Sequence, residues 1–395
     1  MNAPRTLIEA AAELGRAFAA RAAEHDRTGA TPVAQFDALE RAGLLRANIP
    51  ADEGGHGAGL AVSRAIVSEI ARGDPSVALI LSMHYCQHAI ITRAERTASD
   101  DWPPALARRL RRASVEGRAL LNAAQVEPAL GSPSFGGLPD TIAHRTRDGW
   151  RISGHKVYVT GAPLLAWINV LARTDEDEPR LGHFLVPRDA PGVRIVETWD
   201  PIGMRASASH DVLFDDVALA LDEAVALQPA SLDLQRNPHS VAWYLSLIGS
   251  VYDGVARAAR DWIVSFVKER KPSALGGAPL ATVSAVQEGI GRIETLLATS
   301  DWLLDSHARS VDTSEAPDAL AAVVKHAVIA NAIEAVDVAL DLAGNHGLAR
   351  RNPLERHYRD VQCGRVHAPV NGLIRANAGR AALGVLPRAK TRADS

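Results

Sequence analysis

The chain has 395 residues, with 43 basic and 46 acidic side chains and a formal net charge of -3. This length exceeds one compact core and predicts two or three packed units, while the near balance of charge excludes a basic surface for nucleic acid. No stretch reaches the roughly 18 apolar residues of a membrane span, and two cysteines cannot form a disulfide framework, so we expect a reduced, cytoplasmic protein.

The first part of the chain is helical in pattern. Apolar residues recur at helical spacing up to about residue 117, which predicts an N-terminal helical domain over residues 1–117. Asp74 precedes a proline and can act as the N-cap of a helix that carries His84. His84 and His88 lie one helical turn apart, but no third ligand at a suitable spacing accompanies them, so we predict no metal site.

The middle part, residues 118–230, has a strand-like pattern. Short segments rich in β-branched and aromatic residues alternate with Gly, Pro and Asp. Because no helical segment separates them, we predict a small antiparallel β-barrel domain. The alternation within residues 156–160 would place Lys156, Tyr158 and Thr160 on one face of a strand.

The last part, residues 231–395, returns to helical periodicity in long runs. The runs cover residues 242–269, 280–310, 316–348 and about 352–386, the last interrupted near Pro369. Long helices with short connections predict a C-terminal four-helix bundle. The predicted fold is therefore α+β, with N-terminal helices, a small β-barrel and a helical bundle in that order.

Five short motifs occur in the order that is typical of one family. They are residues 49–57 (IPADEGGHG), 125–133 (QVEPALGSP), 156–161 (KVYVTG), 201–207 with 212–217 (PIGMRAS and VLFDDV), and 341–347 with 359–360 (DLAGNHG and RD). Each motif alone is a weak signal, because a glycine-rich loop is usually only a turn. Together they cover nearly the whole chain, and the chain resembles the acyl-CoA dehydrogenase superfamily.

The resemblance implies that a flavin lies between the β domain and the bundle. The residues matched to its ring are Gln125, Val126, Tyr158 and Thr160. The residues matched to its phosphate or adenosine end, across a subunit contact, are Arg270, Gln287, Gly344, Asn345 and Gly347. The second set favours FAD, with FMN as the alternative, and the family's usual assembly implies a homotetramer. Taken alone, Arg270 is a solvated helix-end charge and Thr160 a strand residue.

The resemblance breaks at the catalytic base. The family's base is a glutamate in a Y-E-G-T segment, and Ala368 occupies that position here. Some relatives carry the base on the first bundle helix, where Tyr244 stands instead. No Asp or Glu occurs in residues 361–393 or 234–252. A positioned base contributes about 10²–10⁴-fold to removal of a proton, so the sequence argues against ordinary α,β-dehydrogenation.

The segment His367-Ala368-Pro369-Val370 resembles a motif of another branch of the superfamily, H-D-P-V, although Ala368 replaces its aspartate. That branch includes dibenzothiophene monooxygenase-like enzymes, which use reduced flavin and O₂ to oxygenate a substrate. The match implies catalytic roles for His367, for Thr160 and for His84. An imidazole can move protons near neutral pH without a carboxylate's charge. Without the family match, the expected role of His367 is that of a packing residue at the helix break near Pro369.

The sequence therefore predicts a flavin-dependent oxidoreductase, with monooxygenation of a small molecule as the leading reaction and a flavin reductase as partner. One alternative is an acyl-CoA dehydrogenase with a non-standard base that passes electrons to an electron-transfer protein. Another is a non-catalytic relative that binds flavin or acyl chains. The sequence does not reveal the substrate.

Overall fold

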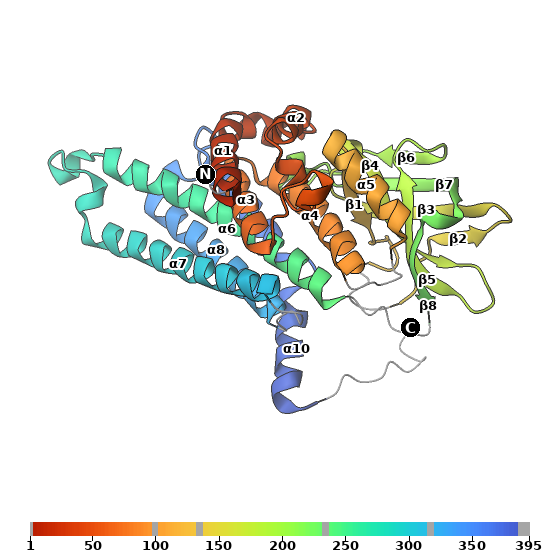
Figure 1. The fold of residues 1–395 in the computed structure, drawn as a ribbon. Coiled ribbons are helices and arrows are strands. Elements are labelled where there is room, and N and C mark those ends of the chain that lie inside the picture. Colours follow the sequence, from red (N-terminus) through yellow and green to blue (C-terminus); the bar gives the residue numbers. More distant parts are fainter. Residues whose placement is uncertain (1–2, 97–101, 132–136, 231–236, 314–319, 386–395) are drawn as a thin grey trace.

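A β-sheet lies between two helical regions in the order of the chain (Figure 1). The computed structural model describes residues 3–96, 102–131, 137–230, 237–313 and 320–385. The end of the second motif, residues 132–133, lies outside these described residues. The chain changes from helix to strand between α5 (Pro104–Glu116) and β1 (Leu120–Ala124), and back between β8 (Ala224–Pro229) and α6 (Pro238–Glu269). The predicted α+β class and its three-part order are confirmed.

The N-terminal region contains α1 (Ala3–Thr28), α2 (Val33–Arg41), α3 (Leu60–Gly73), α4 (Pro75–Arg96) and α5. Helices α1 and α3 pack closely because Gly15 and Gly73 face each other. A Cβ atom on Gly73 would lie 1.9 Å from the carbonyl oxygen of Gly15, so only glycine fits there. Asp74 caps α4 as predicted, since its Oδ1 accepts a hydrogen bond from the Ser76 amide at 3.0 Å.

The middle region is one eight-stranded sheet in the order β6-β7-β3-β2-β4-β5-β8, with β1 beside β4. Its remaining strands are β2 (Ile142–Arg145), β3 (Gly149–Val159), β4 (Leu165–Thr174), β5 (Arg180–Pro187), β6 (Val193–Val196) and β7 (His210–Ala220). The prediction of a purely antiparallel sheet is wrong, because β1 and β2 both run parallel to β4. Strand β1 pairs with the first part of β4 and strand β2 with its last two residues, so the two strands lie one after the other beside β4.

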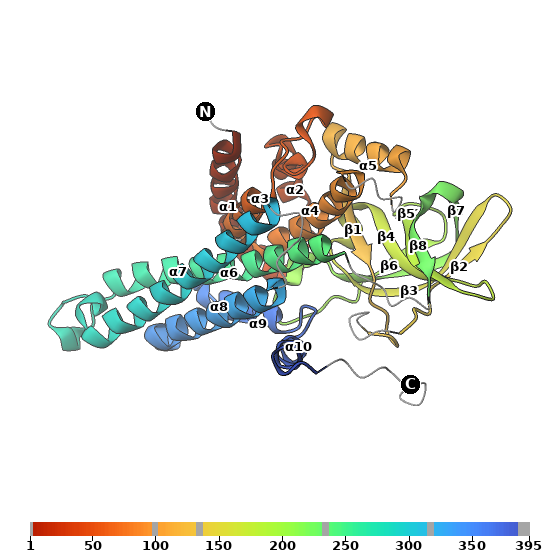
Figure 2. The ribbon, with the colours of Figure 1, turned by 60° about the horizontal axis from the view of Figure 1, so that its bottom comes forward.

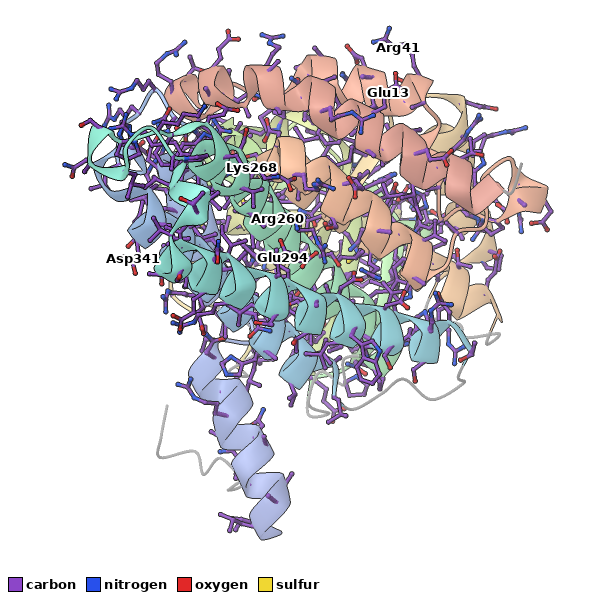
Figure 3. All side chains as sticks on the ribbon, turned by 90° about the vertical axis from the view of Figure 1, so that its left-hand side faces the viewer. Glu13, Arg41, Arg260, Lys268, Glu294 and Asp341 are labelled. Carbon is purple, nitrogen blue, oxygen red and sulfur yellow. The ribbon has the colours of Figure 1, made fainter. Side chains whose placement is uncertain are left out.

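The C-terminal region is the predicted bundle, in which α6, α7 (Ser284–Thr313) and α8 (Ala321–Ala343) lie side by side (Figures 1 and 2). The fourth predicted helix divides into α9 (Leu354–Gln362) and α10 (Asn371–Leu383), with Pro369 in the segment between them. Helix α9 packs on α6 and α8. Helix α10 projects away from the bundle (Figures 1 and 3), and Ile374 is its one buried residue.

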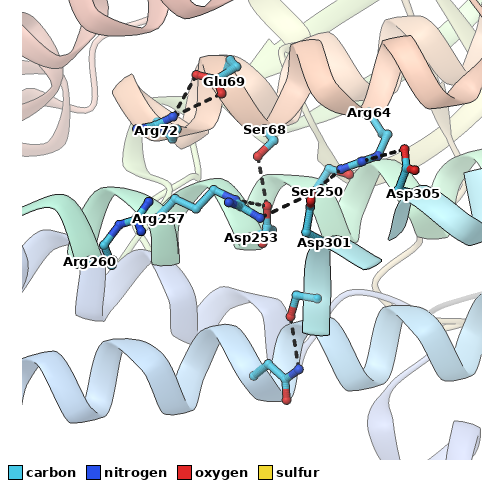
Figure 4. Close-up of polar contacts among 12 residues, drawn as sticks. Arg64, Ser68, Glu69, Arg72, Ser250, Asp253, Arg257, Arg260, Asp301 and Asp305 are labelled. Carbon is cyan, nitrogen blue, oxygen red and sulfur yellow. Dashed lines mark hydrogen bonds and ion pairs between the residues drawn. The ribbon is translucent and has the colours of Figure 1, made fainter. Parts of the chain in front are cut away.

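Ion pairs join the N-terminal helices to the bundle (Figure 4). Arg64 on α3 has a nearly buried side chain and contacts Asp301 at 3.2 Å and Asp305 at 3.0 Å on α7. Ser68 on α3 donates a hydrogen bond of 3.1 Å to the buried carboxylate of Asp253 on α6. A guanidinium with two carboxylate partners fixes the two regions to each other with defined geometry.

An ion pair also joins helices within the bundle. Arg260 on α6 and Glu294 on α7, labelled in Figure 3, form an ion pair of 2.7 Å that joins these two helices. Among the helices that the structure describes, none is long and apolar enough to cross a membrane.

Candidate functional site

The end of β1 and the end of β3 lie against each other. The Val157 amide donates a hydrogen bond to the carbonyl oxygen of Val126 at 3.0 Å, and the Asn122 side chain donates one to the carbonyl oxygen of Thr160 at 3.0 Å. The Gln125 side chain lies 3.3 Å from the His183 ring. The structure therefore brings together the residues that the sequence matched to a flavin ring: Gln125, Val126, Tyr158 and Thr160.

A buried ion pair supports this junction. The Lys156 ammonium donates to Glu127 at 2.6 Å, and both side chains are almost fully buried. Burial favours the neutral form of Glu127, but hydrogen bonds from Lys156 and Thr141 outweigh it and hold the pKa of Glu127 below its ordinary value. For Lys156 burial is the larger effect, and its pKa is lowered. The pair fixes the start of the loop after β1 to strand β3.

The prediction that Lys156, Tyr158 and Thr160 share one face of a strand is wrong. Strand β3 has an irregular register between Lys156 and Val159, and Tyr158 adopts a positive φ of 59°. A bulge of this kind inserts a residue and reverses the side to which the next side chain points. Lys156 is consequently buried, whereas Tyr158 is 63% exposed and packs edge-on against Trp199, with ring centroids 6.3 Å apart.

Thr160 ends a short chain of hydroxyl groups. The Ser209 hydroxyl donates to Thr160 Oγ1 at 3.0 Å, and the Ser207 hydroxyl lies 2.9 Å from that of Ser209. Because Thr160 Oγ1 accepts the Ser209 proton, its own proton can be donated to a bound molecule. Ser207 was not among the site residues predicted from the sequence, although it lies in one of the five motifs.

His367 lies in the segment between α9 and α10. Its ring is 5.6 Å from the ring of Tyr252 on α6, and its carbonyl oxygen accepts a hydrogen bond of 2.7 Å from the Lys325 ammonium on α8. Burial, helped by the positive charge of Lys325, lowers the pKa of His367 to about 4. The imidazole is therefore neutral at neutral pH and can both donate and accept a proton.

Tyr252 was not predicted from the sequence, yet its side chain lies beside His367. Its side chain is fully buried, and its hydroxyl has no hydrogen-bond partner among the described residues. Burial raises the pKa of Tyr252 well above its ordinary value. An unpaired buried phenol is costly and is a candidate donor to a bound molecule. Its position on α6, eight residues after Tyr244, is the one signal that could have revealed it.

His84 has a different environment from His367. Its Nε2 lies 2.9 Å from the carbonyl oxygen of Leu45, and its Nδ1 accepts a hydrogen bond of 3.3 Å from the Leu121 amide. Burial lowers the pKa of His84 to about 4. Both ring nitrogens thus bind backbone groups, and the ring connects α4 to β1 and to the turn at residues 44–46. We therefore assign His84 no part in the proposed chemistry.

The residues matched to the adenosine end of a flavin lie at the far end of the bundle. Arg270 follows the last residue of α6, and its carbonyl oxygen accepts from the Leu280 amide at 2.9 Å. The Gln287 side-chain amide donates a hydrogen bond of 3.0 Å to the carbonyl oxygen of Ala281, in the connection between α6 and α7. Gly344 adopts a positive φ of 55° after α8. Gly344 and Asn345 are exposed, whereas Gly347 is buried. The far end of α6 and the sheet lie on opposite sides of the molecule (Figure 1), and His346 in the loop after α8 packs against Phe266 near that end, with ring centroids 5.1 Å apart. The structure therefore does not bring the two predicted sets together within one chain.

No group of three or more His, Cys, Asp or Glu side chains in the described part of the chain could hold a metal ion. His88 lies beside His84, with ring centroids 4.6 Å apart, and its Nε2 contacts the Ser114 hydroxyl at 3.0 Å. Burial lowers the pKa of His88 well below its ordinary value. The two histidines are therefore buried packing groups in this structure.

The order of helices, sheet and bundle, with the motif loops at the β1–β3 junction and after α8, is that of a flavoprotein dehydrogenase fold. Residues 3–109 match the acyl-CoA dehydrogenase N-terminal domain, residues 123–217 the middle domain and residues 246–372 the C-terminal domain. These matches cover most of the 395 residues. The chain belongs to the acyl-CoA dehydrogenase family.

Its relatives include both dehydrogenases and other oxidative enzymes. The chain is 32% identical over 378 residues to YdbM of Bacillus subtilis, provisionally named as an acyl-CoA dehydrogenase, with 94% of each chain covered. It is 32% identical over 382 residues to L-evernosamine nitrososynthase of a Micromonospora species, covering 92% of this chain and 86% of the relative. The structure of KijD3 in complex with FMN and a dTDP-amino sugar superposes with a TM-score of 0.86 at 28% identity, covering 99% and 96% of the two chains. The chain is thus an oxidoreductase of this family.

Proposed function

We propose that this protein is a flavin-dependent monooxygenase that oxygenates a small molecule. The main support for this proposal comes from residues 367–369. Ala368 replaces the carboxylate expected of a dehydrogenase, and His367 places a neutral imidazole beside Tyr252. A neutral imidazole and an unpaired phenol can donate hydrogen bonds and move protons, but they supply no carboxylate base for a Cα proton.

The side chains at the β1–β3 junction fit a flavin ring. The exposed ring of Tyr158 beside Trp199 provides an aromatic surface, and Thr160 has a hydroxyl proton to donate. At the far end of the bundle, Arg270 and the exposed backbone around Gly344 suit an anionic phosphate. A second copy of the chain would have to supply this second set to the same cofactor. These contacts favour FAD, and the FMN complex of KijD3 makes FMN the alternative.

When bound in its reduced form, the flavin supplies two electrons, so that one atom of O₂ is transferred to the substrate and the other leaves as water. In this proposal the Thr160 hydroxyl orients the ring by donating a hydrogen bond to it. His367 holds or passes a proton at its ring nitrogens, and the Tyr252 hydroxyl binds an oxygen or nitrogen atom of the substrate. Tyr252 is fully buried, and its side chain would help to exclude water from the reacting atoms.

A dehydrogenase is the second candidate. It is favoured by the similarity to YdbM and by the presence of Arg270 and Gln287 at the positions matched to an adenosine end. A dehydrogenase would need a base for the substrate's Cα proton, and Ala368 and Tyr244 stand at the two positions where the family carries a glutamate. The carboxyl group of Asp360 contributes to the raised pKa of Tyr252, but Asp360 is buried and accepts a hydrogen bond from the Met204 amide at 2.7 Å.

The deciding experiment compares two half-reactions. Protein loaded with oxidised FAD or FMN is first mixed anaerobically with a series of acyl-CoA thioesters, and flavin absorbance is followed; we expect no bleaching. The same protein is then reduced chemically and mixed with O₂ and candidate substrates, beginning with amino sugars because of the nitrososynthase relative. We expect an oxygenated product that carries ¹⁸O from ¹⁸O₂. Rapid bleaching by an acyl-CoA without ¹⁸O incorporation would establish the dehydrogenase instead.

A further inference from the structure

Lys325 on α8 is fully buried although it carries a charged side chain. Its ammonium donates hydrogen bonds to two carbonyl oxygens, that of His367 at 2.7 Å and that of Pro369 at 3.1 Å. No carboxylate contacts it among the described residues. A buried ammonium without a counter-ion is costly, and the carbonyl oxygens are the groups that stabilise it here.

The segment that Lys325 binds is also held at its start. Gly364 packs between α6 and α8, and a Cβ atom there would lie 2.8 Å from Ile329 and 3.3 Å from the Tyr252 ring. Ile329 is one turn after Lys325 on α8, so both side chains lie on the same face of that helix. The segment from Gly364 to Pro369 is therefore fixed at two points, by close packing at its start and by the ammonium at its end.

We propose that Lys325 is a positioning residue, whose ammonium fixes the carbonyl groups of His367 and Pro369 and thereby sets where the His367 imidazole lies against Tyr252. This inference rests on the proposed role of His367. A lysine ammonium suits the task because its three donors rotate freely and can serve two carbonyl groups that point in different directions. The carbonyl groups at a helix break would otherwise lack partners.

The charge of Lys325 acts on the same imidazole. Burial lowers the pKa of Lys325 to about 8, so the ammonium remains the main form at neutral pH. Around the segment, α6 contributes Tyr252, α8 contributes Lys325, and α9 with its following turn contributes Asp360 and Cys363. Of these, Lys325 is the group whose charge acts on His367, and it opposes protonation of the ring.

The first test reads the imidazole directly by NMR of ring-labelled histidine, with the His367 signal assigned from its loss in His367→Gln. In the native protein the ring should stay neutral down to about pH 4. In Lys325→Met we expect the pKa of His367 to rise toward the ordinary value of 6.5, because the opposing charge is lost and the segment loosens. Lys268→Met, on the exposed end of α6 in Figure 3, should leave the signal unchanged. An unchanged His367 titration in folded Lys325→Met would overturn the proposal.

The second test is a double-mutant cycle on the rate of product formation. Lys325→Met should lower the rate by about tenfold or more in the native background, because misplacing a group by about 1 Å can cost up to 10²-fold. In the His367→Gln background it should cause no further loss. Equal losses in both backgrounds would mean a general structural role and would contradict the proposal.

Lys325→Gln, which keeps an uncharged amide with two N–H donors, replaces Lys325→Met if the latter does not fold. The same outcomes then support or contradict the proposal. The NMR titration needs no turnover, so it can support the positioning role even where no oxygenation is detected. Failure of the proposed function and failure of this inference are thus separate results.

Discussion

At the scale of single residues, His367 is the side chain on which the proposed chemistry depends. Substituting His367→Gln keeps a hydrogen-bonding group of similar size but removes the proton relay. We expect oxygen transfer to fall by about 10²–10⁴-fold, the range typical of a lost acid–base group, while flavin affinity stays unchanged. His144→Gln, at an exposed position on β2, serves as the matched control. A variant that retained more than a tenth of native activity would contradict the role.

The same residue predicts a pH dependence. Because the pKa of His367 in the folded protein is about 4, its protonation state does not change between pH 5.5 and 8. The rate of oxygen transfer should therefore show no inflection from His367 over this range and should fall only toward pH 4. A rate profile with a histidine-like inflection near 6.5 that disappears in His367→Gln would show that the ring titrates normally.

Asp360, the aspartate of the R-D motif, predicts an effect on stability. Burial raises its pKa to about 7, above the ordinary value of 3.8, so the folded state binds more protons than the unfolded state between these pH values. Stability from this group is therefore lost as pH rises through that window. Asp360→Asn removes this pH dependence. The difference in free energy of unfolding between the variant and the native protein should therefore shift in favour of the variant by about 2 kcal/mol from pH 5 to pH 8. Urea denaturation at the two pH values measures this, with the exposed Asp52→Asn as control.

At the scale of elements, the buried pair of Glu127 and Lys156 fixes the β1–β3 junction. Glu127→Gln leaves the Lys156 ammonium buried without its carboxylate. We expect a loss of about 3–5 kcal/mol in the free energy of unfolding. Flavin binding should also weaken, because the segments that we propose to contact the flavin ring separate. The exposed pair on α5 provides the comparison, and Glu116→Gln there should cost no more than about 0.5 kcal/mol. Equal costs at the two sites would show that burial of the pair is unimportant.

The elements themselves were largely predictable from the sequence, because long periodic helices and short β-branched strands are signals within one segment. The predictions fail where the local structure depends on residues that are distant in the sequence but close in space. The bulge that separates Lys156 from Tyr158 depends on pairing with β7, and the parallel pairing of β1 and β2 depends on their position along β4. Tyr252 and Lys325 belong to no motif; each becomes part of the candidate site only because α6 and α8 pack against the segment after α9.

At the scale of the whole molecule, the two predicted cofactor-binding sets lie on opposite sides, because one belongs to the β domain and the other follows the far end of α6 (Figure 1). Thr160 and Tyr158 belong to the β domain, whereas Arg270 and Gly344 belong to the remote end of the bundle. A complete site for FAD would therefore require two copies of the chain, each contributing one set. Closed symmetry would then create two equivalent sites in each pair of copies.

This arrangement predicts complementation between defective chains. Thr160→Val should impair a site from the β-domain side, and Arg270→Ala should impair it from the bundle side, so each variant alone binds FAD weakly. In a mixed pair, one site carries both changes and the other carries neither. After unfolding and refolding equal amounts together, about a quarter of all sites should be native, as random pairing within a twofold assembly requires. Quenching of FAD fluorescence on titration measures the recovered tight sites. If the mixture binds no better than the average of its two components, the two sets do not combine across two copies of the chain, and the two-copy site is wrong.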